Sequence, residues 1–476
     1  MHNKINDLKF KVIFTIIILT SLFLKVYLLI IWPQESGDKE IYYILAENII
    51  RGCGLSKSPP ELDECILISG TYFPGFPFLI SIFWYFVSEN IIYLLLFNCL
   101  FFTLSFYFLM KAFLLLSINK NILFLLLLLF ALSPLQSGWF RFIVLTEPMA
   151  ISLSLFFLAE LIYSISQKKL RVVRFATILA CSVFIRPDTI LMSISILPVA
   201  FYIYNLKEAI SKILIFIFLI SIPIGSWMTR NILIGHKPIS IEESSSPGYI
   251  KWTKTWIINE YERGDASFPL YHKQYKNIKI HNSKYIEDKE NIKINKLLVK
   301  LNKFEYRPFP KIIDKEFEKI ANEKIKSRNF SSNLEIYFKR SLYILMNPFS
   351  SFGMPFELKS LNKEEFGNSL FSINLKYLIN FLNDNYKSVI GKAIIFLYRI
   401  IIMSILILSL FRIITNIYYK IKLTKIDILT ISITSYFLLR LSFFVTTVEL
   451  ESRYMVESII WIEALAILFF QRKNKY

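Results

Sequence analysis

The sequence predicts an all-α polytopic membrane protein with about ten transmembrane helices, interfacial helices in the first external loop and a small, mainly helical external domain. Two observations lead to this fold class. Hydrophobic residues make up 54% of the 476 residues, which is more than a water-soluble chain usually carries. These residues are also gathered into separate apolar runs of roughly 17 or more, which is long enough to cross the hydrocarbon core of a bilayer.

The apolar runs predict where the spans begin and end. The first run follows several lysines and is too long for the core of a signal peptide, so we expect an uncleaved first helix. Residues 74–88 are apolar but short and open with two prolines, which predicts an interfacial helix. The predicted spans are residues 10–31, 90–116, 120–138, 146–165, 170–186, 188–204, 210–229, 390–412, 424–446 and 455–471.

The formal net charge of +19 is explained by the short loops between these runs. With a cytoplasmic N-terminus, every inside segment is basic, as the positive-inside rule requires. Both termini are then expected to be cytoplasmic. The charge therefore indicates topology and contact with membrane lipids, and no nucleic-acid partner is expected.

The same topology divides the chain into three parts. Residues 1–245 form an N-terminal transmembrane module that includes the first external loop, 32–89. Residues 246–389 form an extracytoplasmic domain, and residues 390–476 supply the C-terminal transmembrane helices. Within the external domain, residues 312–330 show helical periodicity. The apolar face predicted for that helix comprises Ile312, Ile313, Phe317, Ile320 and Ile325.

The four cysteines form two pairs of different character. Cys53 and Cys65 lie in the first external loop, whereas Cys99 and Cys181 lie inside apolar runs. On an oxidising side of the membrane, Cys53 and Cys65 are candidates for a disulfide, and two free thiols are the alternative. Cys99 and Cys181 are expected to be small apolar fillers. No spacing typical of a metal site is present.

Several chemistries lack their usual signatures. The sequence contains no phosphate-binding loop, dinucleotide-binding glycine motif, zinc-protease motif or serine-hydrolase elbow. What remains is a set of acids and arginines at the predicted outer edge of the membrane. A carboxylate can activate a hydroxyl group while guanidinium groups hold a phosphate. The acids and arginines are Asp38, Arg141, Glu147, Arg186, Arg230 and Arg453.

These residues lie within an ordered series of motifs. Asp38, Tyr42, Gly52, Gly54 and the run Tyr72–Phe78 resemble the first external loop of the GT-C integral membrane glycosyltransferases. The likeness is greatest to bacterial protein O-mannosyltransferases and lipid A aminoarabinose transferases. The later matches follow in family order over essentially the whole chain and are Leu145–Met149, Arg186 with Pro187, Trp227 with Arg230 and Asn231, and Arg453 with Tyr454.

The resemblance implies transfer of a hexosyl or pentosyl group from a polyprenyl-phosphate donor to a glycan, lipid or protein acceptor on the extracytoplasmic face, with inversion. It implies that Asp38 is the catalytic base and that Glu147 positions the acceptor or the base. The implied donor-phosphate ligands are Arg186, Arg230, Arg453 and Arg141, and the implied substrate contacts are Tyr42, Tyr72 and His236.

The first motif departs from the family pattern in one respect. Relatives often carry two adjacent acids there, but Lys39 separates Asp38 from Glu40 in this chain. We therefore assign no metal site to paired carboxylates in this motif. A divalent metal ion is the one cofactor that the resemblance leaves open.

Two other function classes remain as alternatives. A flippase or transporter of lipid-linked saccharide would need charged or broken helices near the middle of the bilayer. Four ionisable residues stand out within the predicted spans, Lys111, Glu160, Arg440 and Glu463, and each is expected to reach a segment end or to face the protein interior. The third class, a membrane anchor for a binding domain at residues 246–385, does not require about ten spans.

Overall fold

The fold is almost entirely helical, as predicted. The computed structural model describes residues 2–58, 65, 67, 73–116, 120–235, 246–280, 285–347, 350–358 and 375–470. About 79% of the structure is helix. In the described part, the one sheet is a two-stranded parallel pair, β1 (Gln34–Glu35) with β2 (Phe142–Ile143).

The chain divides into two compact units, and unit 1 carries most of the apolar helices. Unit 1 comprises Met1–Ser240, Pro348–Leu438 and Val456–Tyr476, and unit 2 comprises Ile241–Asn347 and Leu439–Met455. The elements of unit 1 are α1 (His2–Ile31), β1, α2 (Lys39–Ile50), α3 (Gly75–Phe86), α4 (Ile92–Leu114), α5 (Lys120–Ala131), α6 (Pro134–Ser137), η1 (Gly138–Arg141), β2, α7 (Glu147–Gln167), α8 (Val172–Ile185), η2 (Pro187–Ser195), α9 (Ile196–Ile203), α10 (Leu206–Leu233), α17 (Leu375–Tyr418) and α19 (Val456–Phe470). Helix α18 (Lys425–Thr447) begins in unit 1 and ends in unit 2.

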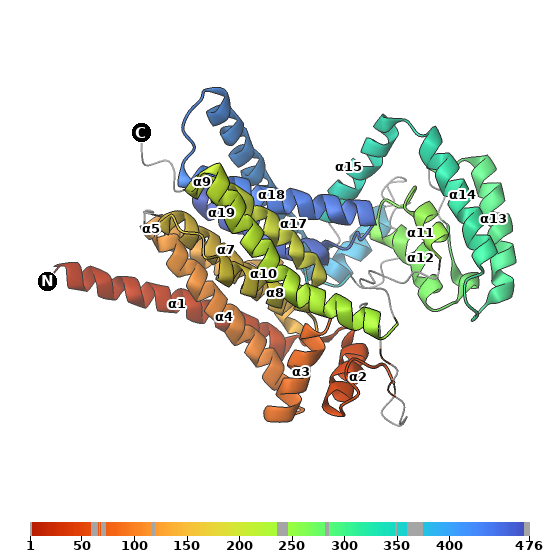
Figure 1. The fold of residues 1–476 in the computed structure, drawn as a ribbon, viewed down its shortest axis with the longest axis horizontal. Coiled ribbons are helices and arrows are strands. Elements are labelled where there is room, and N and C mark those ends of the chain that lie inside the picture. Colours follow the sequence, from red (N-terminus) through yellow and green to blue (C-terminus); the bar gives the residue numbers. More distant parts are fainter. Residues whose placement is uncertain are drawn as a thin grey trace. The chain divides into compact units, whose positions relative to one another are not determined.

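Helix α7 is the central helix of unit 1. It is buried along most of its length and contacts α4, α8, α9 and α19. Helices α4 and α7 run side by side (Figure 1). Helix α10, by contrast, keeps most of its apolar surface exposed. This arrangement is that of a bundle whose outer helices face an apolar surrounding rather than water.

Seven helical segments in the described residues are long and apolar enough to cross a membrane. Each of them overlaps one of the predicted spans, and five extend beyond its predicted ends. The segments are Lys11–Ile31, Ile92–Leu114, Lys120–Arg141, Glu147–Gln167, Leu206–Leu233, Ile379–Tyr418 and Lys425–Thr447.

The other three predicted spans form shorter helices, α8, η2 with α9, and α19. Helix α8 ends at Ile185 because Pro187 restricts the residue before it to extended backbone, and Arg186 has φ −145° and ψ 114°. Helix α3 is also short, with 12 residues, in keeping with the interfacial helix predicted there.

Unit 2 is a helical unit with an aromatic core. Its elements are α11 (Pro247–Thr253), α12 (Glu260–Tyr271), η3 (Tyr275–Asn277), α13 (Asp288–Leu301), η4 (Asn302–Phe304), α14 (Lys311–Ser327), α15 (Phe330–Met346), the end of α18 and η5 (Ser452–Met455). Helices α13 and α14 lie side by side (Figure 1). The side chain of Asp314 accepts hydrogen bonds from the backbone N–H groups of Gly248 (3.1 Å) and Tyr249 (2.9 Å), which satisfies the first turn of α11. The aromatic core comprises Tyr249, Trp252, Trp256, Phe309 and Phe317.

The helix predicted over residues 312–330 ends earlier than expected. Ile313, Phe317 and Ile320 are buried, as the periodicity predicts, but Ile312 is 80% exposed and Ile325 is 49% exposed. The helix stops at Ser327, and α15 begins at Phe330 after an extended residue at Arg328.

Two glycines, Gly138 and Gly353, allow two backbone segments of unit 1 to lie in close contact. A Cβ atom on Gly138 would lie 2.6 Å from backbone atoms of Phe352, Gly353 and Met354. Gly353 has φ +77°, and a Cβ there would lie 2.7 Å from Gly138. We expect Gly138→Ala to lower the midpoint of thermal unfolding strongly, because backbone on both sides must move to admit a methyl group. The measurement is the unfolding temperature of purified protein in detergent.

Gly225→Ala is the matched control for this prediction. Gly225 lies inside α10, and nothing lies within 4 Å of the position of its added Cβ. Alanine there should be neutral or stabilise the helix by up to about 1 kcal/mol. Equal unfolding temperatures for the two variants would contradict the close contact at Gly138.

Candidate active site

The two predicted acids follow the two strands of one parallel pair. Gln34 pairs with Phe142 and Glu35 pairs with Ile143. The pairing is extended by the Ser36 hydroxyl group, which donates to the carbonyl oxygen of Val144 at 2.7 Å. Because the strands of a parallel pair run in the same direction, the segments that lead to Asp38 and Glu147 leave the pair at the same end. Asp38 lies at the N-cap of α2 and Glu147 begins α7.

Arg141 fixes the segment that follows α1. Its guanidinium group donates to the carbonyl oxygen of Trp32 (3.2 Å), to the side chain of Gln34 and to the carbonyl oxygen of Gly353. The side chain is buried. Arg141 was predicted to hold a donor phosphate, but these partners give its N–H groups a scaffold role. Contact with a phosphate would require them to change partners.

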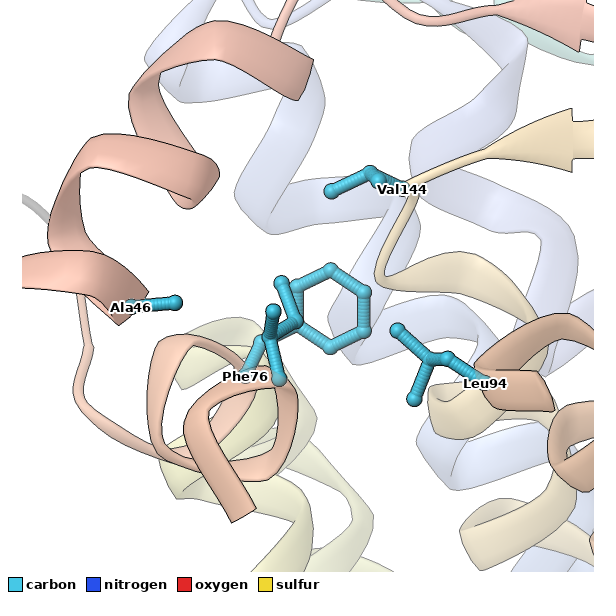
Figure 2. Packing of buried hydrophobic residues seen from close by; sticks show 5 residues of the cluster. Ala46, Phe76, Leu94 and Val144 are labelled. Carbon is cyan, nitrogen blue, oxygen red and sulfur yellow. The ribbon is translucent and has the colours of Figure 1, made fainter. Parts of the chain in front are cut away.

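Val144, between β2 and Glu147, has a strained backbone. Its φ is +60°, a conformation that β-branched residues rarely adopt. Such strain costs about 1–3 kcal/mol and is retained where surrounding packing determines the conformation. Val144 is buried in a hydrophobic cluster with Ala46, Phe76, Ile80 and Leu94. Figure 2 shows the Phe76 ring between Ala46 on one side and Leu94 and Val144 on the other.

The same cluster joins three segments that carry predicted site residues. Tyr42, one turn after Asp38, packs against Phe76 with ring centroids 5.0 Å apart. Ile185, which precedes Arg186, also packs against the cluster. Gly75 lies so close to α8 that an added Cβ would be 2.7 Å from the backbone of Phe184. Tyr42, predicted to contact substrate, therefore has a clear packing role.

Arg186 is the centre of a buried ionic cluster. Its Nη1 lies 2.9 Å from Oε1 of Glu147, and its Nε lies 3.3 Å from Oδ1 of Asp188 and 3.5 Å from Oε1 of Glu457. Arg186, Glu147 and Glu457 are buried. The structure thus brings Glu147 and Arg186 together as an ion pair. Arg186 was predicted to hold a donor phosphate, and here its guanidinium group holds carboxylates.

The helix ends around this cluster favour its charges. Glu147, Asp188 and Glu457 each lie in the first turn of a helix, namely α7, η2 and α19. Arg186 follows the C-terminus of α8. Helix N-termini stabilise negative charge and C-termini stabilise positive charge. The helix N-termini therefore stabilise the three carboxylates that lie around Arg186.

Arg230 lies near the end of α10, in a half-buried position. Its guanidinium group lies 4.9 Å from the centre of the Trp227 ring and donates to Oδ1 of Asn231 at 2.9 Å. Trp227 in turn lies 6.1 Å, centre to centre, from Phe73 at the start of α3. The structure therefore places this end of α10 beside Phe73, just before α3.

Arg453 belongs to unit 2 and lies in a second ionic group. It pairs with Glu451 and donates to the Tyr454 hydroxyl group at 3.3 Å. Arg263 lies 2.5 Å from Glu449 and 3.3 Å from Glu451. Burial raises the pKa of the Tyr454 hydroxyl group, which keeps it neutral beside the guanidinium group. Arg453 is thus bound to a carboxylate, that of Glu451, within its own unit.

A disulfide and two glycines constrain the described residues just after α2. Cys53 and Cys65 form a disulfide, with Cα atoms 5.3 Å apart. Gly52 and Gly54 both have positive φ, 83° and 62°, a conformation that favours glycine. Tyr72 and His236, predicted to contact substrate, lie outside the described residues.

A divalent metal ion was the cofactor left open by the sequence. Among the residues that the structure describes, no group of three or more histidine, cysteine, aspartate or glutamate side chains is arranged to hold a metal ion. Comparison with known protein families, curated proteins and solved structures found no match to this chain.

Sequence reasoning missed some charged residues of these clusters. Asp188 and Glu457 complete the cluster around Arg186, and Arg263 joins the group around Arg453. A local signal for Asp188 and Glu457 was available in the sequence. Like Glu147, each is an acid in the first turn of an apolar helix, where the helix N-terminus stabilises negative charge. Nothing in the sequence around Arg263 distinguishes it from other arginines.

Proposed function

We propose that this protein is a GT-C-type glycosyltransferase of the bacterial plasma membrane, which transfers a hexosyl or pentosyl group from a polyprenyl-phosphate donor to an extracytoplasmic acceptor. The observation that carries the proposal is the parallel pair of β1 and β2, which leads Asp38 and Glu147 away from the same end. The hydrophobic cluster around Phe76 brings Arg186 to the same part of unit 1 through Ile185.

Asp38 is the catalytic base in this proposal. Its carboxylate takes the proton of the acceptor hydroxyl group as that oxygen attacks the anomeric carbon. The bond between the anomeric carbon and the phosphate oxygen breaks, and its electron pair leaves with polyprenyl phosphate. Attack from the face opposite the phosphate inverts the anomeric centre through an oxocarbenium-like state. Asp38 suits this role because it is half-buried rather than enclosed.

Glu147 and Arg186 position the site rather than react. Both are buried, and they pair at 2.9 Å, so Glu147 fixes the start of α7 against the end of α8. Arg230 is then the favoured ligand for the donor phosphate. It is less buried than Arg186 and is bordered by Trp227, whose apolar surface suits a lipid-linked substrate.

The topology in this proposal has about ten spans. Seven correspond to the long apolar helices, and α8, η2 with α9, and α19 supply the rest. The termini are then cytoplasmic, and Asp38 and Glu147 are extracytoplasmic.

We expect Arg230→Ala to raise the apparent KM for the donor about tenfold or more, because a charge-assisted contact with phosphate contributes roughly 1.5–3 kcal/mol. Arg230→Lys keeps the charge and should recover part of the loss. The matched control is Lys207→Ala, an exposed cation at the other end of the same helix. An unchanged donor KM in Arg230→Ala would remove this phosphate role.

A flippase or transporter of lipid-linked saccharide is the second candidate, because the structure buries charges within membrane segments. Lys25, in α1, is fully buried, and its ammonium group lies 3.1 Å from the Ser21 hydroxyl group and 3.9 Å above the Phe102 ring. Glu463, in α19, is buried and accepts a hydrogen bond from Ser133. Buried charges of this kind often mark ion or substrate pathways.

The fate of the donor separates the two candidates. A transferase breaks the bond between sugar and phosphate and releases polyprenyl phosphate, whereas a flippase leaves this bond intact. Mass spectrometry of the lipid fraction after incubation with reconstituted protein distinguishes them. Intact donor moved across the vesicle membrane, at the same rate in Asp38→Asn, would favour the flippase.

A further inference from the structure

Helix α15 of unit 2 has an apolar face turned away from the core. Ile336, Arg340 and Ile344 form its buried side. The opposite side carries large hydrophobic side chains with high exposed fractions. These are Phe330 (78%), Leu334 (49%), Tyr337 (42%), Phe338 (64%) and Leu342 (45%).

These five side chains form one stripe. Phe330, Leu334, Phe338 and Leu342 recur every four residues, close to the 3.6-residue turn of an α-helix. The polar residues Glu335 and Lys339 lie at the margin of the stripe and pair with one another at 2.8 Å. A helix that faces water carries polar residues on its outer side. The stripe instead exposes an apolar area on the order of several hundred Å², which indicates a binding surface.

The contacts of Arg340 place the middle of α15 against the end of a membrane segment. Its guanidinium group donates to the carbonyl oxygens of Ile257 (2.8 Å), Lys254 (2.6 Å) and Val445 (3.1 Å). Val445 lies in the last turn of α18, whose segment Lys425–Thr447 is apolar enough to cross a membrane. The residues of α18 from Leu439 onward belong to the same compact unit as α15.

We propose that α15 is an interfacial helix whose stripe is inserted into the lipid bilayer, at the boundary between head groups and acyl chains. The end of a membrane-crossing helix lies at this depth, and Arg340 ties α15 to it. Leu439, on α18 within this unit, is apolar and 38% exposed, so this position is also suited to contact with lipid. Amphipathic helices bind in this way with their apolar face about 5–10 Å into the boundary region.

The bilayer fits this surface better than a second protein would. Lys339 borders the stripe and carries a long side chain that can keep its ammonium group at the head groups while its methylenes contact apolar surface. The exposed Lys326, at the end of α14, adds another cation near the start of α15. Cations at this level are attracted to anionic head groups.

The test uses full-length protein with Cys181→Ser, reconstituted in vesicles of phosphatidylcholine and phosphatidylglycerol. Cys99 is buried and Cys53 is joined to Cys65, so a nitroxide label attaches at the introduced cysteine. The label is placed at Phe338→Cys and, in a second protein, at Leu342→Cys. Accessibility to oxygen, which concentrates in the bilayer, is compared with accessibility to a water-soluble nickel chelate.

Two exposed positions provide the references. Leu214→Cys, in the middle of α10, reports a lipid-facing site, and Lys296→Cys, on α13, reports a water-facing site. We expect labels at 338 and 342 to favour oxygen as the label at 214 does. Labels that favour the nickel chelate, as at 296, would overturn the proposal. So would labels shielded from both reagents with spin–spin broadening, because this result would show that a second copy covers the stripe.

Discussion

Replacing Asp38 with asparagine is expected to lower the rate of sugar transfer by roughly 10²- to 10⁴-fold, the range that a positioned general base contributes. Asparagine has nearly the same shape as aspartate but cannot accept the acceptor's proton. Because asparagine keeps the shape of the side chain at the N-cap of α2, the protein should remain folded and inserted. The measurement is turnover of purified, reconstituted protein with a polyprenyl-phosphate sugar donor.

Glu40→Gln is the matched control for this prediction. Glu40 is an exposed acid in the first turn of α2, two positions from Asp38. It should retain most of the wild-type rate. If Asp38→Asn turned over at the wild-type rate, or if Glu40→Gln alone were inactive, the base would have been assigned to the wrong residue.

Arg186→Met should destabilise the protein by about 3–5 kcal/mol, because it leaves buried carboxylates without their cation. Arg186 contacts Glu147, Asp188 and Glu457, and methionine fills a similar volume without any charge. We expect a large fall in unfolding temperature or a loss of monodisperse protein. Adding Glu457→Gln to the same chain should restore part of the stability, since it neutralises the carboxylate that lies 3.5 Å from the lost guanidinium group.

Arg174→Met, in the first turns of α8, is the control. The Arg174 side chain is 63% exposed, and its partner Glu160 (3.2 Å) also pairs with Arg171 (3.5 Å), so this substitution should cost at most about 1 kcal/mol. One combination of results would instead support a donor-phosphate role for Arg186. Wild-type unfolding temperature in Arg186→Met, together with weaker donor binding, would show that its guanidinium group serves the substrate.

The helical fold could be predicted from the sequence because its main signals are local. Runs of apolar residues are visible one segment at a time, and the Pro187 break that separates α8 from η2 is a property of neighbouring residues. The C-terminal end of α14 was harder to predict. Ile325 fits the apolar periodicity of the helix, but the backbone is extended at Arg328, and a separate helix, α15, begins at Phe330.

The packing around the candidate site could not be predicted from local signals. Strands β1 and β2 have two residues each, which is too short for any alternation of polar and apolar residues to appear. The positive φ of Val144 depends on burial against Phe76 and Leu94 from other helices. Lys25 was overlooked because one charge hardly changes the hydropathy of a long span, and its ring partners Phe102 and Phe140 are distant in sequence.

The residues that matched a family pattern were also those with local signals. Asp38, Glu147 and Arg186 lie next to helix ends marked by Pro or by acids in the first turn. Glu457 meets Arg186 only through the packing of α19 against α7. Charged residues whose partners lie on distant helices can therefore be identified only from the three-dimensional structure.

The central claim is that Asp38 acts in the transfer of a lipid-linked sugar to an extracytoplasmic acceptor. The most direct measurement is mass spectrometry of the surface glycoconjugates of a strain that lacks this protein, before and after complementation. We expect a sugar to disappear in the deletion strain, to return with the wild type and with Glu40→Gln, and to remain absent with Asp38→Asn at equal protein levels. Unchanged glycoconjugates in the deletion strain, or full restoration by Asp38→Asn, would contradict the claim.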